Sequence, residues 1–248
     1  MTTTPYGTWH SPISAGLIAS EAVGLGEPRL DGADCYWLEQ RPTEGGRSVL
    51  VRHGTDGVNR DVTPAGFNVR TRVHEYGGGA YTVANGTVFF ANFADQRVHR
   101  QTRGGSVHPL TPAAALRYAD FAVDAARQRL IAVREDHRDF DAEPINTIVA
   151  IDWHDEQANA DGGRVLVGGD DFYSSPRLSP DGSQLAWLSW NHPDMPWDST
   201  TLWLARIADY GSLHRFLPEI LHSILKVAAP LPHGRILRLE ARAKPFFL

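Results

Sequence analysis

Short apolar runs joined by tight turns constrain the fold of this chain more than any other feature of its sequence. The clearest case is residues 80–91, where Ala-Tyr-Thr-Val-Ala leads through Asn85-Gly86 into Thr-Val-Phe-Phe-Ala. An Asn-Gly pair between two such runs is a strong hairpin signal, because the turn requires positive φ at both residues. Residues 80–91 are therefore predicted to form a β-hairpin.

Runs of the same kind recur up to residue 206, with almost no helical periodicity between them. Further strands are predicted at residues 35–39, 48–52, 96–100, 120–124, 129–134, 147–152, 176–178, 184–190 and 201–206. Many short strands separated by Gly-rich turns are typical of all-β proteins, whether sandwich, barrel or propeller.

The repeat of these strands favours a propeller. A unit of turn, apolar strand, polar connection and second strand is centred near Trp37, Phe89, Ile131 and Trp187. The intervals are close to the roughly 40–50 residues of one four-stranded propeller blade. Ser-Pro-Asp-Gly at 179–182 fits the turn between the first two strands of a blade. We therefore expect an all-β partial β-propeller of about four four-stranded blades with a short helical C-terminal tail, and keep a plain sandwich as the alternative.

The end of the chain differs in composition from the rest. Both lysines, Lys226 and Lys244, lie there, and the net charge is −9 for residues 1–213 but +4 for residues 214–248. Apolar residues follow at helical spacing, namely Leu217, Ile220, Leu221, Ile224, Leu225 and Ala228. This spacing predicts an amphipathic helix.

We interpret residues 1–210 as an incomplete N-terminal propeller and residues 211–248 as a divergent, helical tail. A frameshifted or truncated coding sequence is one hypothesis for the change. A C-terminal helix docked on the propeller is the other.

Charge and composition exclude several classes of function. The net charge of −5 gives no basic surface for a nucleic acid. A single cysteine, Cys35, excludes an internal disulfide and a multi-cysteine metal site, and we expect it to be a small buried apolar residue. Without an 18-residue apolar run or a signal peptide, we expect no membrane span and a cytoplasmic location.

Motifs that would carry chemistry are missing. No Gly-x-Ser-x-Gly nucleophile elbow occurs, and Gly77-Gly78-Gly79 lacks the Lys-Ser/Thr of a phosphate-binding loop. The densest set of metal-ligand types is His137 with Asp136, Asp139 and Asp141, which lacks the spacing of a calcium loop. We therefore predict no catalytic residue, no metal site and no cofactor.

Residues 72–76, Arg-Val-His-Glu-Tyr, form another concentrated polar set. On a strand, the adjacent His74 and Glu75 would point to opposite faces, so they do not form a dyad by themselves. Hydrogen bonding between blades is the structural interpretation of these residues.

Several segments in order resemble bacterial prolyl oligopeptidase family serine peptidases of the acylaminoacyl-peptidase or dipeptidyl-aminopeptidase type. They are residues 6–13, 72–79, 133–137, 143–150 and 171–198. Ser-Pro-Asp-Gly alone occurs in many propellers, but the ordered set is specific. Together the segments span about residues 5–205.

The resemblance implies an N-terminal β-propeller that covers an α/β-hydrolase domain carrying a Ser-Asp-His triad and admits only short peptides. Only the propeller part is matched, so it implies a non-catalytic, substrate-gating fragment without peptidase activity alone. Its implied partners are a peptide substrate and the missing hydrolase domain.

His74, Glu75 and Tyr76 are the candidates for a surface facing the active-site cavity. There Glu75 would hold a free peptide amine through a charge-assisted hydrogen bond. Two alternatives remain, a stand-alone propeller that binds a protein or peptide and a metal-dependent propeller hydrolase of the lactonase kind.

Overall fold

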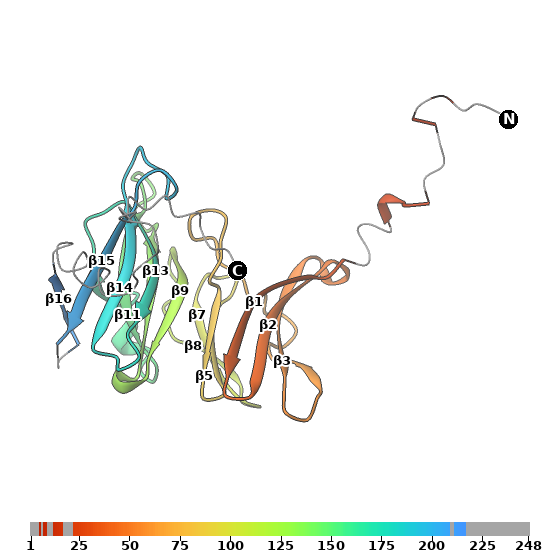
Figure 1. Cartoon of the computed structure of the whole chain (residues 1–248), viewed down its shortest axis with the longest axis horizontal. Coiled ribbons are helices and arrows are strands. Elements are labelled where there is room, and N and C mark those ends of the chain that lie inside the picture. The colour runs from red at the N-terminus through yellow and green to blue at the C-terminus, as the bar shows by residue number, and fades with distance from the viewer. Residues whose placement is uncertain (1–4, 6, 9–11, 17–21, 209–210, 217–248) are drawn as a thin grey trace, which may run out of the picture.

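The described residues form four antiparallel sheets of four strands each, arranged as the blades of a propeller (Figure 1). The computed structural model describes residues 5, 7–8, 12–16, 22–208 and 211–216. Every strand pairs with its neighbour in sequence, so each blade is a simple meander.

The first two blades differ in strand length, because the first three strands of blade 1 have seven or eight residues and those of blade 2 have four or five. Blade 1 consists of β1 (Gly24–Asp31), β2 (Asp34–Arg41), β3 (Arg47–His53) and β4 (Asn59–Asp61). Blade 2 consists of β5 (Tyr81–Ala84), β6 (Thr87–Ala91), β7 (Val98–Thr102) and β8 (Val107–Pro109).

The first three strands of the other two blades have seven to nine residues each. Blade 3 consists of β9 (Leu116–Asp124), β10 (Arg129–Asp136), β11 (Ile145–Asp152) and β12 (Arg164–Val167). Blade 4 consists of β13 (Phe172–Leu178), β14 (Gln184–Trp190), β15 (Thr201–Ile207) and β16 (Leu213–Phe216).

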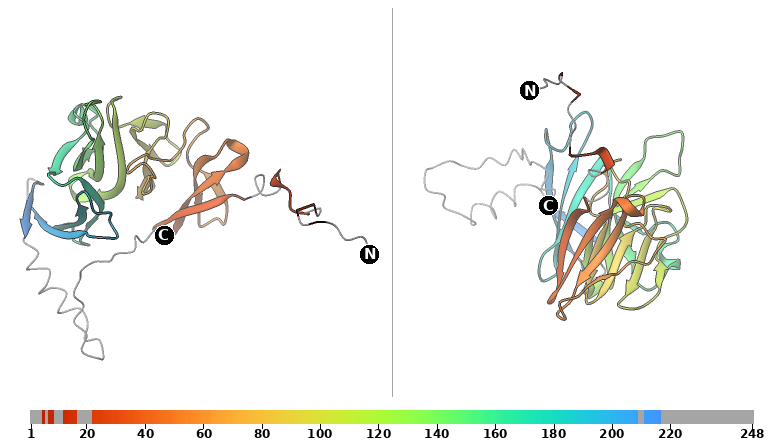
Figure 2. Two further views of the ribbon diagram at one scale, coloured as in Figure 1. Left: turned by 90° about the horizontal axis from the view of Figure 1, so that it is seen from above. Right: turned by 90° about the vertical axis from the view of Figure 1, so that its right-hand side faces the viewer.

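The first strand of each blade lies on the inner side of the array. β1 lies beside β5, β5 beside β9, and β9 beside β13. Seen from above, the blades follow one another along an open arc, with blade 1 at one end and blade 4 at the other (Figure 2). The predicted partial propeller of four four-stranded blades is confirmed.

The strongest apolar runs of the sequence are the second strands of the blades. Trp37 lies on β2, Phe89 on β6, Ile131 on β10 and Trp187 on β14. In an inner blade both faces of the sheet are covered, so successive side chains are buried in different interfaces. Phe89 belongs to the core between blades 2 and 3, whereas the next residue, Phe90, belongs to the core between blades 1 and 2.

Blade 1 shows the opposite case, because it lies at the end of the arc. Leu25 and Leu30 of β1 are 72% and 77% exposed. Cys35, expected to be buried, is only half-buried on β2. On the face of this blade toward blade 2, Tyr36 and Leu50 are buried in the core between the two blades.

The predicted turns are confirmed. Asn85 and Gly86 join β5 to β6 with φ of 50° and 72°. Residues 179–183 join β13 to β14, and there the Asp181 carboxylate accepts hydrogen bonds from the backbone N–H and the hydroxyl of Ser183 at 3.0 and 2.8 Å. These bonds, with one from the Ser179 hydroxyl, lower the pKa of Asp181 to about 2.

The end of blade 4 overlaps the segment predicted to be a tail. Leu213–Phe216 forms β16 and pairs with β15, so the blade is completed beyond residue 210. The predicted helix, residues 217–228, lies outside the described residues.

A buried ion pair lies within blade 3, between β9 and β10, and its arginine also bonds to blade 4. The Nε of Arg129 donates to Asp124 Oδ2 at 2.8 Å, and its Nη1 donates to the Gly211 carbonyl of the β15–β16 turn at 2.9 Å. The two side chains are 7% and 1% exposed. Burial lowers the pKa of Arg129, and the bond to Asp124 opposes that effect.

Within residues 22–208, helix is limited to three single 3-10 turns: η1 (Pro42–Glu44), η2 (Ala125–Arg127) and η3 (Gln157–Asn159). None of these is long and apolar enough to cross a bilayer.

Candidate functional site

Residues 71–79, within the connection from β4 to β5, form a loop that reaches three blades besides its own neighbour β5; we call it the central loop. Its Val73 is buried in the core between blades 3 and 4. The His74 N–H reaches Glu135 of blade 3, and the Gly79 N–H reaches Glu27 of blade 1. The loop therefore crosses the array on the side where the inner strands begin. It does not run along blade 1 or blade 2.

The backbone of the central loop is strained. His74 and Glu75 both adopt positive φ, 55° and 64°, which is uncommon for residues with a side chain. Gly77 also has positive φ, and a Cβ there would lie 2.6 Å from the Thr71 carbonyl oxygen. Such strain persists only where surrounding contacts fix the chain, and it gathers at functional sites.

Glu135 of β10 is the buried carboxylate under the central loop. It is 4% exposed, and its Oε1 accepts the His74 N–H at 2.6 Å. Its Oε2 lies 2.9 Å from the Nε2 of His137, and Arg117 lies 3.6 Å away. One carboxylate thus joins the loop, β9 and the β10–β11 connection.

The ring of His74 lies among aromatic side chains of blade 4. It contacts Trp190 at 5.4 Å and Phe172 at 6.0 Å between ring centroids, and Tyr76 of the loop at 5.7 Å. Burial lowers the pKa of His74, and the charges of Glu135 and Asp120 only partly oppose it. The ring is therefore neutral near pH 7.

Glu75 and Tyr76 point outward from the same loop. The Glu75 side chain is 77% exposed and pairs with Arg117 Nη1 at 2.5 Å, which lowers its pKa. Tyr76 is 55% exposed, and partial burial raises the pKa of its hydroxyl. The structure thus brings the rings of His74 and Tyr76 together and turns Glu75 to solvent.

His74, Glu75 and Tyr76 belong to a turn. The expectation that His74 and Glu75 point to opposite faces assumed a strand. His74 and Glu75 make the contacts between blades that the sequence had suggested. Their role toward a substrate stays a prediction.

A second group of residues lies on the inner strands and was missed by the sequence analysis. At equivalent places, Glu27 on β1, Asp120 on β9 and Ser175 on β13 have φ of 51°, 55° and 55°, and Gly79 before β5 has φ of 61°. The three strand positions coincide with bulges in the pairing to the second strand.

Hydrogen bonds connect these four positions from blade to blade. The Gly79 N–H donates to Glu27 at 3.1 Å, and the Gly79 carbonyl accepts the Asp120 N–H at 2.9 Å. Asp120 Oδ2 in turn accepts the Ser175 N–H at 3.0 Å. Burial raises the pKa of Glu27, although Arg29 opposes this rise.

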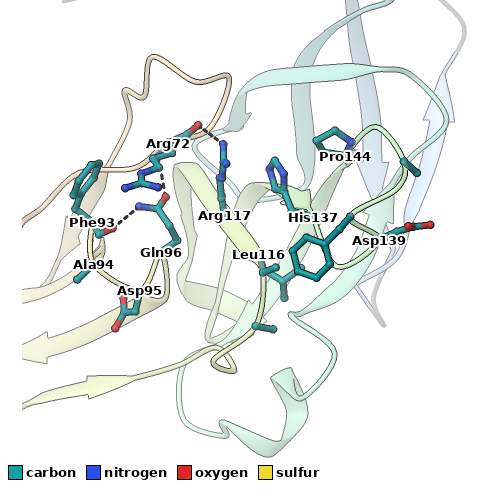
Figure 3. A pocket seen from close by; sticks show the side chains of 14 residues that line it. Arg72, Phe93, Ala94, Asp95, Gln96, Leu116, Arg117, His137, Asp139 and Pro144 are labelled. Carbon is teal, nitrogen blue, oxygen red and sulfur yellow. Dashed lines mark hydrogen bonds between the residues drawn. The ribbon is translucent and has the colours of Figure 1, made fainter.

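A pocket of about 420 Å³ lies on the outer side of the central loop, between the connections of blades 2 and 3 (Figure 3). Arg72 and Arg117 lie along it, and Arg117 Nη1 donates to the Arg72 carbonyl at 3.1 Å. The Arg72 guanidinium stacks 4.5 Å from the centroid of Phe93. Phe140, 87% exposed, forms the far wall.

No group of three or more metal-ligand side chains gathers in the part of the chain that the structure describes. The sequence cluster around His137 is used otherwise: His137 bonds to Glu135, and Asp136 pairs with Arg138 at both of its oxygens.

Solved structures give the relatives of this fold. A puromycin hydrolase is 36% identical, with a TM-score of 0.77, over 86% of this chain and 35% of that one. A Mycobacterium tuberculosis puromycin-hydrolyzing peptidase is 41% identical, with a TM-score of 0.76, over 86% of this chain and 35% of that one.

A Pyrococcus horikoshii acylaminoacyl peptidase has the same fold at 12% identity, with a TM-score of 0.54 over 80% of this chain and 32% of its own. No protein-family model and no curated protein matches the chain.

The chain therefore spans about a third of the solved relatives it matches, at 35% of each puromycin-hydrolysing protein. The matched part is the array of blades, in agreement with the resemblance of the sequence segments. The chain is homologous to the β-propeller part of the prolyl oligopeptidase family peptidases.

Proposed function

We propose that this chain is a substrate-gating propeller of a prolyl oligopeptidase family peptidase, in which an α/β-hydrolase domain outside these 248 residues cleaves short peptides. The observation that carries the proposal is the 36–41% identity to two puromycin-hydrolysing proteins over 86% of the chain. The sequence itself holds no Gly-x-Ser-x-Gly elbow, so the propeller contributes access and orientation, not the nucleophile. A cytoplasmic location is part of the same proposal.

The central loop supports a gating role. It contacts blades 1, 3 and 4 and so crosses the side of the array on which the inner strands begin. An extended peptide is narrow enough to pass between such loops, whereas a folded domain is not. Glu75, exposed on this loop, is the group we propose for a free peptide amine.

A chimera tests the proposal. Residues 24–207 replace the corresponding part of the Mycobacterium tuberculosis puromycin-hydrolyzing peptidase, and hydrolysis of puromycin, a short peptide and a folded protein is measured. We expect the first two substrates to be cleaved and the folded protein to be spared. Cleavage of the folded protein at a similar rate would refute the gating role. The 248-residue chain alone is expected to cleave neither a free-amine nor an N-blocked peptide.

A stand-alone propeller that binds a partner is the second candidate. Exposed apolar side chains favour it, because Phe140 is 87% and Trp197 is 49% exposed on the connections that join the second to the third strand of blades 3 and 4. A monodisperse chain with one cooperative unfolding transition would favour this reading. A chain that aggregates and is digested rapidly would favour the peptidase fragment.

A further inference from the structure

We propose that Glu135 is the positioning residue that fixes the central loop over the inner edges of the blades. The inference deepens the proposed function, because it names the group that would set the gate. No sequence motif assigns this role to Glu135, which lies 61 residues from the loop residue that it binds.

The first support is the position of the contact within the loop. Glu135 accepts its hydrogen bond at His74, where the run of positive φ begins. The next bonds of the loop are internal: the Glu75 N–H donates to the Arg72 carbonyl and the Gly77 N–H to the Val73 carbonyl. The Glu135 bond therefore ties the first residue of the strained turn to blade 3 through a charged acceptor.

The second support is the setting of Glu135 itself. Its carboxylate is nearly inaccessible to solvent, and a buried carboxylate needs partners at both oxygens. The loop supplies one partner through the His74 N–H, and His137 supplies the other. Loss of the loop contact would leave one oxygen of Glu135 unpaired, so the loop and the carboxylate hold each other in place.

The third support is the pair formed by Glu75 and Arg117. Arg117 bonds to Glu75 and to the Arg72 carbonyl, and it also lies 3.6 Å from Glu135. Glu135 thus holds the guanidinium that steadies the outer side of the loop. Since Glu75 is highly exposed, that outer contact alone is a weak one.

Amide hydrogen exchange on the full 248-residue chain tests the proposal. The variant Glu135→Gln keeps the shape of the side chain but removes its charge, and the exposed Glu143→Gln on the neighbouring β10–β11 connection is the matched control. We expect the amides of His74, Glu75 and Gly77 to exchange roughly ten-fold faster or more in Glu135→Gln. This factor corresponds to the loss of one charge-assisted hydrogen bond. The amides of β11, and the control, should stay unchanged.

Two results would overturn the inference. One is unchanged exchange at the three loop amides, and the other is an equal acceleration throughout blade 3, which would make Glu135 a general stabilising residue. If Glu135→Gln does not fold, Glu135→Asp shortens the side chain while keeping the charge near His137 and is read in the same way. The exchange measurement and the chimera assay can fail separately. Glu135 can hold the loop even if the chimera does not distinguish short peptides from a folded protein.

Discussion

The buried ion pair of blade 3, whose Arg129 also bonds to the Gly211 carbonyl of blade 4, gives a sharp prediction about stability. In Asp124→Ala, Arg129 loses its carboxylate partner while only 7% of its side chain is exposed. Removing one partner of a buried pair costs about 3–5 kcal/mol, because the remaining charge stays buried without compensation. That is a large share of the roughly 5–15 kcal/mol that stabilise a typical folded domain.

Urea unfolding followed by tryptophan fluorescence measures the effect. Trp187, 1% exposed, lies in the core between the same two blades and reports on their separation. With an m-value of about 3 kcal/mol/M, the midpoint should fall by roughly 1–1.7 M. The control Asp141→Ala, at an exposed aspartate, should change the free energy of unfolding by no more than about 0.5 kcal/mol.

The double variant Asp124→Ala/Arg129→Met separates the two contributions. Without the charge at position 129, no buried ion is left unpaired, so part of the loss should be recovered. A loss below about 1 kcal/mol in the single variant, or a double variant no more stable than the single, would contradict the reasoning.

Three further predictions concern the loop and a turn. Gly79→Ala should lower the free energy of unfolding by about 2 kcal/mol or more, because φ is +61° and a Cβ would lie 2.9 Å from a backbone nitrogen of β9. The control Gly57→Ala, where φ is +73° and the space is open, should lower it by less. Two-dimensional NMR should show Asp181 titrating at about 2, with the turn stabilised above pH 4 and weakened as pH falls toward 2; Ser183→Ala should raise this pKa. Burial lowers the pKa of His74, so below about pH 6.5 the unfolded chain binds more protons at this ring than the folded chain does. The amides of the loop should therefore be less protected from exchange as the pH falls. Equal protection at pH 5 and pH 8 would contradict this.

The second strands of the blades could be predicted from the sequence because burial on two faces produces continuous apolar runs. The run from Val88 to Ala91 on β6 is an example, and all of its residues are buried. The outer strands β4 and β8 could not be predicted, since they have three residues each, Asn-Arg-Asp and Val-His-Pro, and neither forms an apolar run. Their pairing depends on β3 and β7, which the local sequence does not show.

The candidate site could be predicted only in part. The residues from His74 to Tyr76 were found because polar and aromatic types gather there, but their positive φ is imposed by the fold. Glu135 lies in the segment 133–137 that resembles the peptidase family, but its separation of 61 residues from His74 hides their contact. Asp120 is the first residue of the predicted strand 120–124, and only the bulge on β9 places its carboxylate against blade 4.

The meander within each blade has a consequence for how the molecule is made. Every strand pairs with the one before or after it, and each blade packs on the blade next in sequence. On the ribosome, blade 1 can therefore form its sheet as soon as it emerges. Blade 2 follows and covers the face of blade 1 on which Tyr36 and Leu50 lie. Synthesis and assembly run in the same direction, and the newest blade always presents an uncovered surface to the residues that follow.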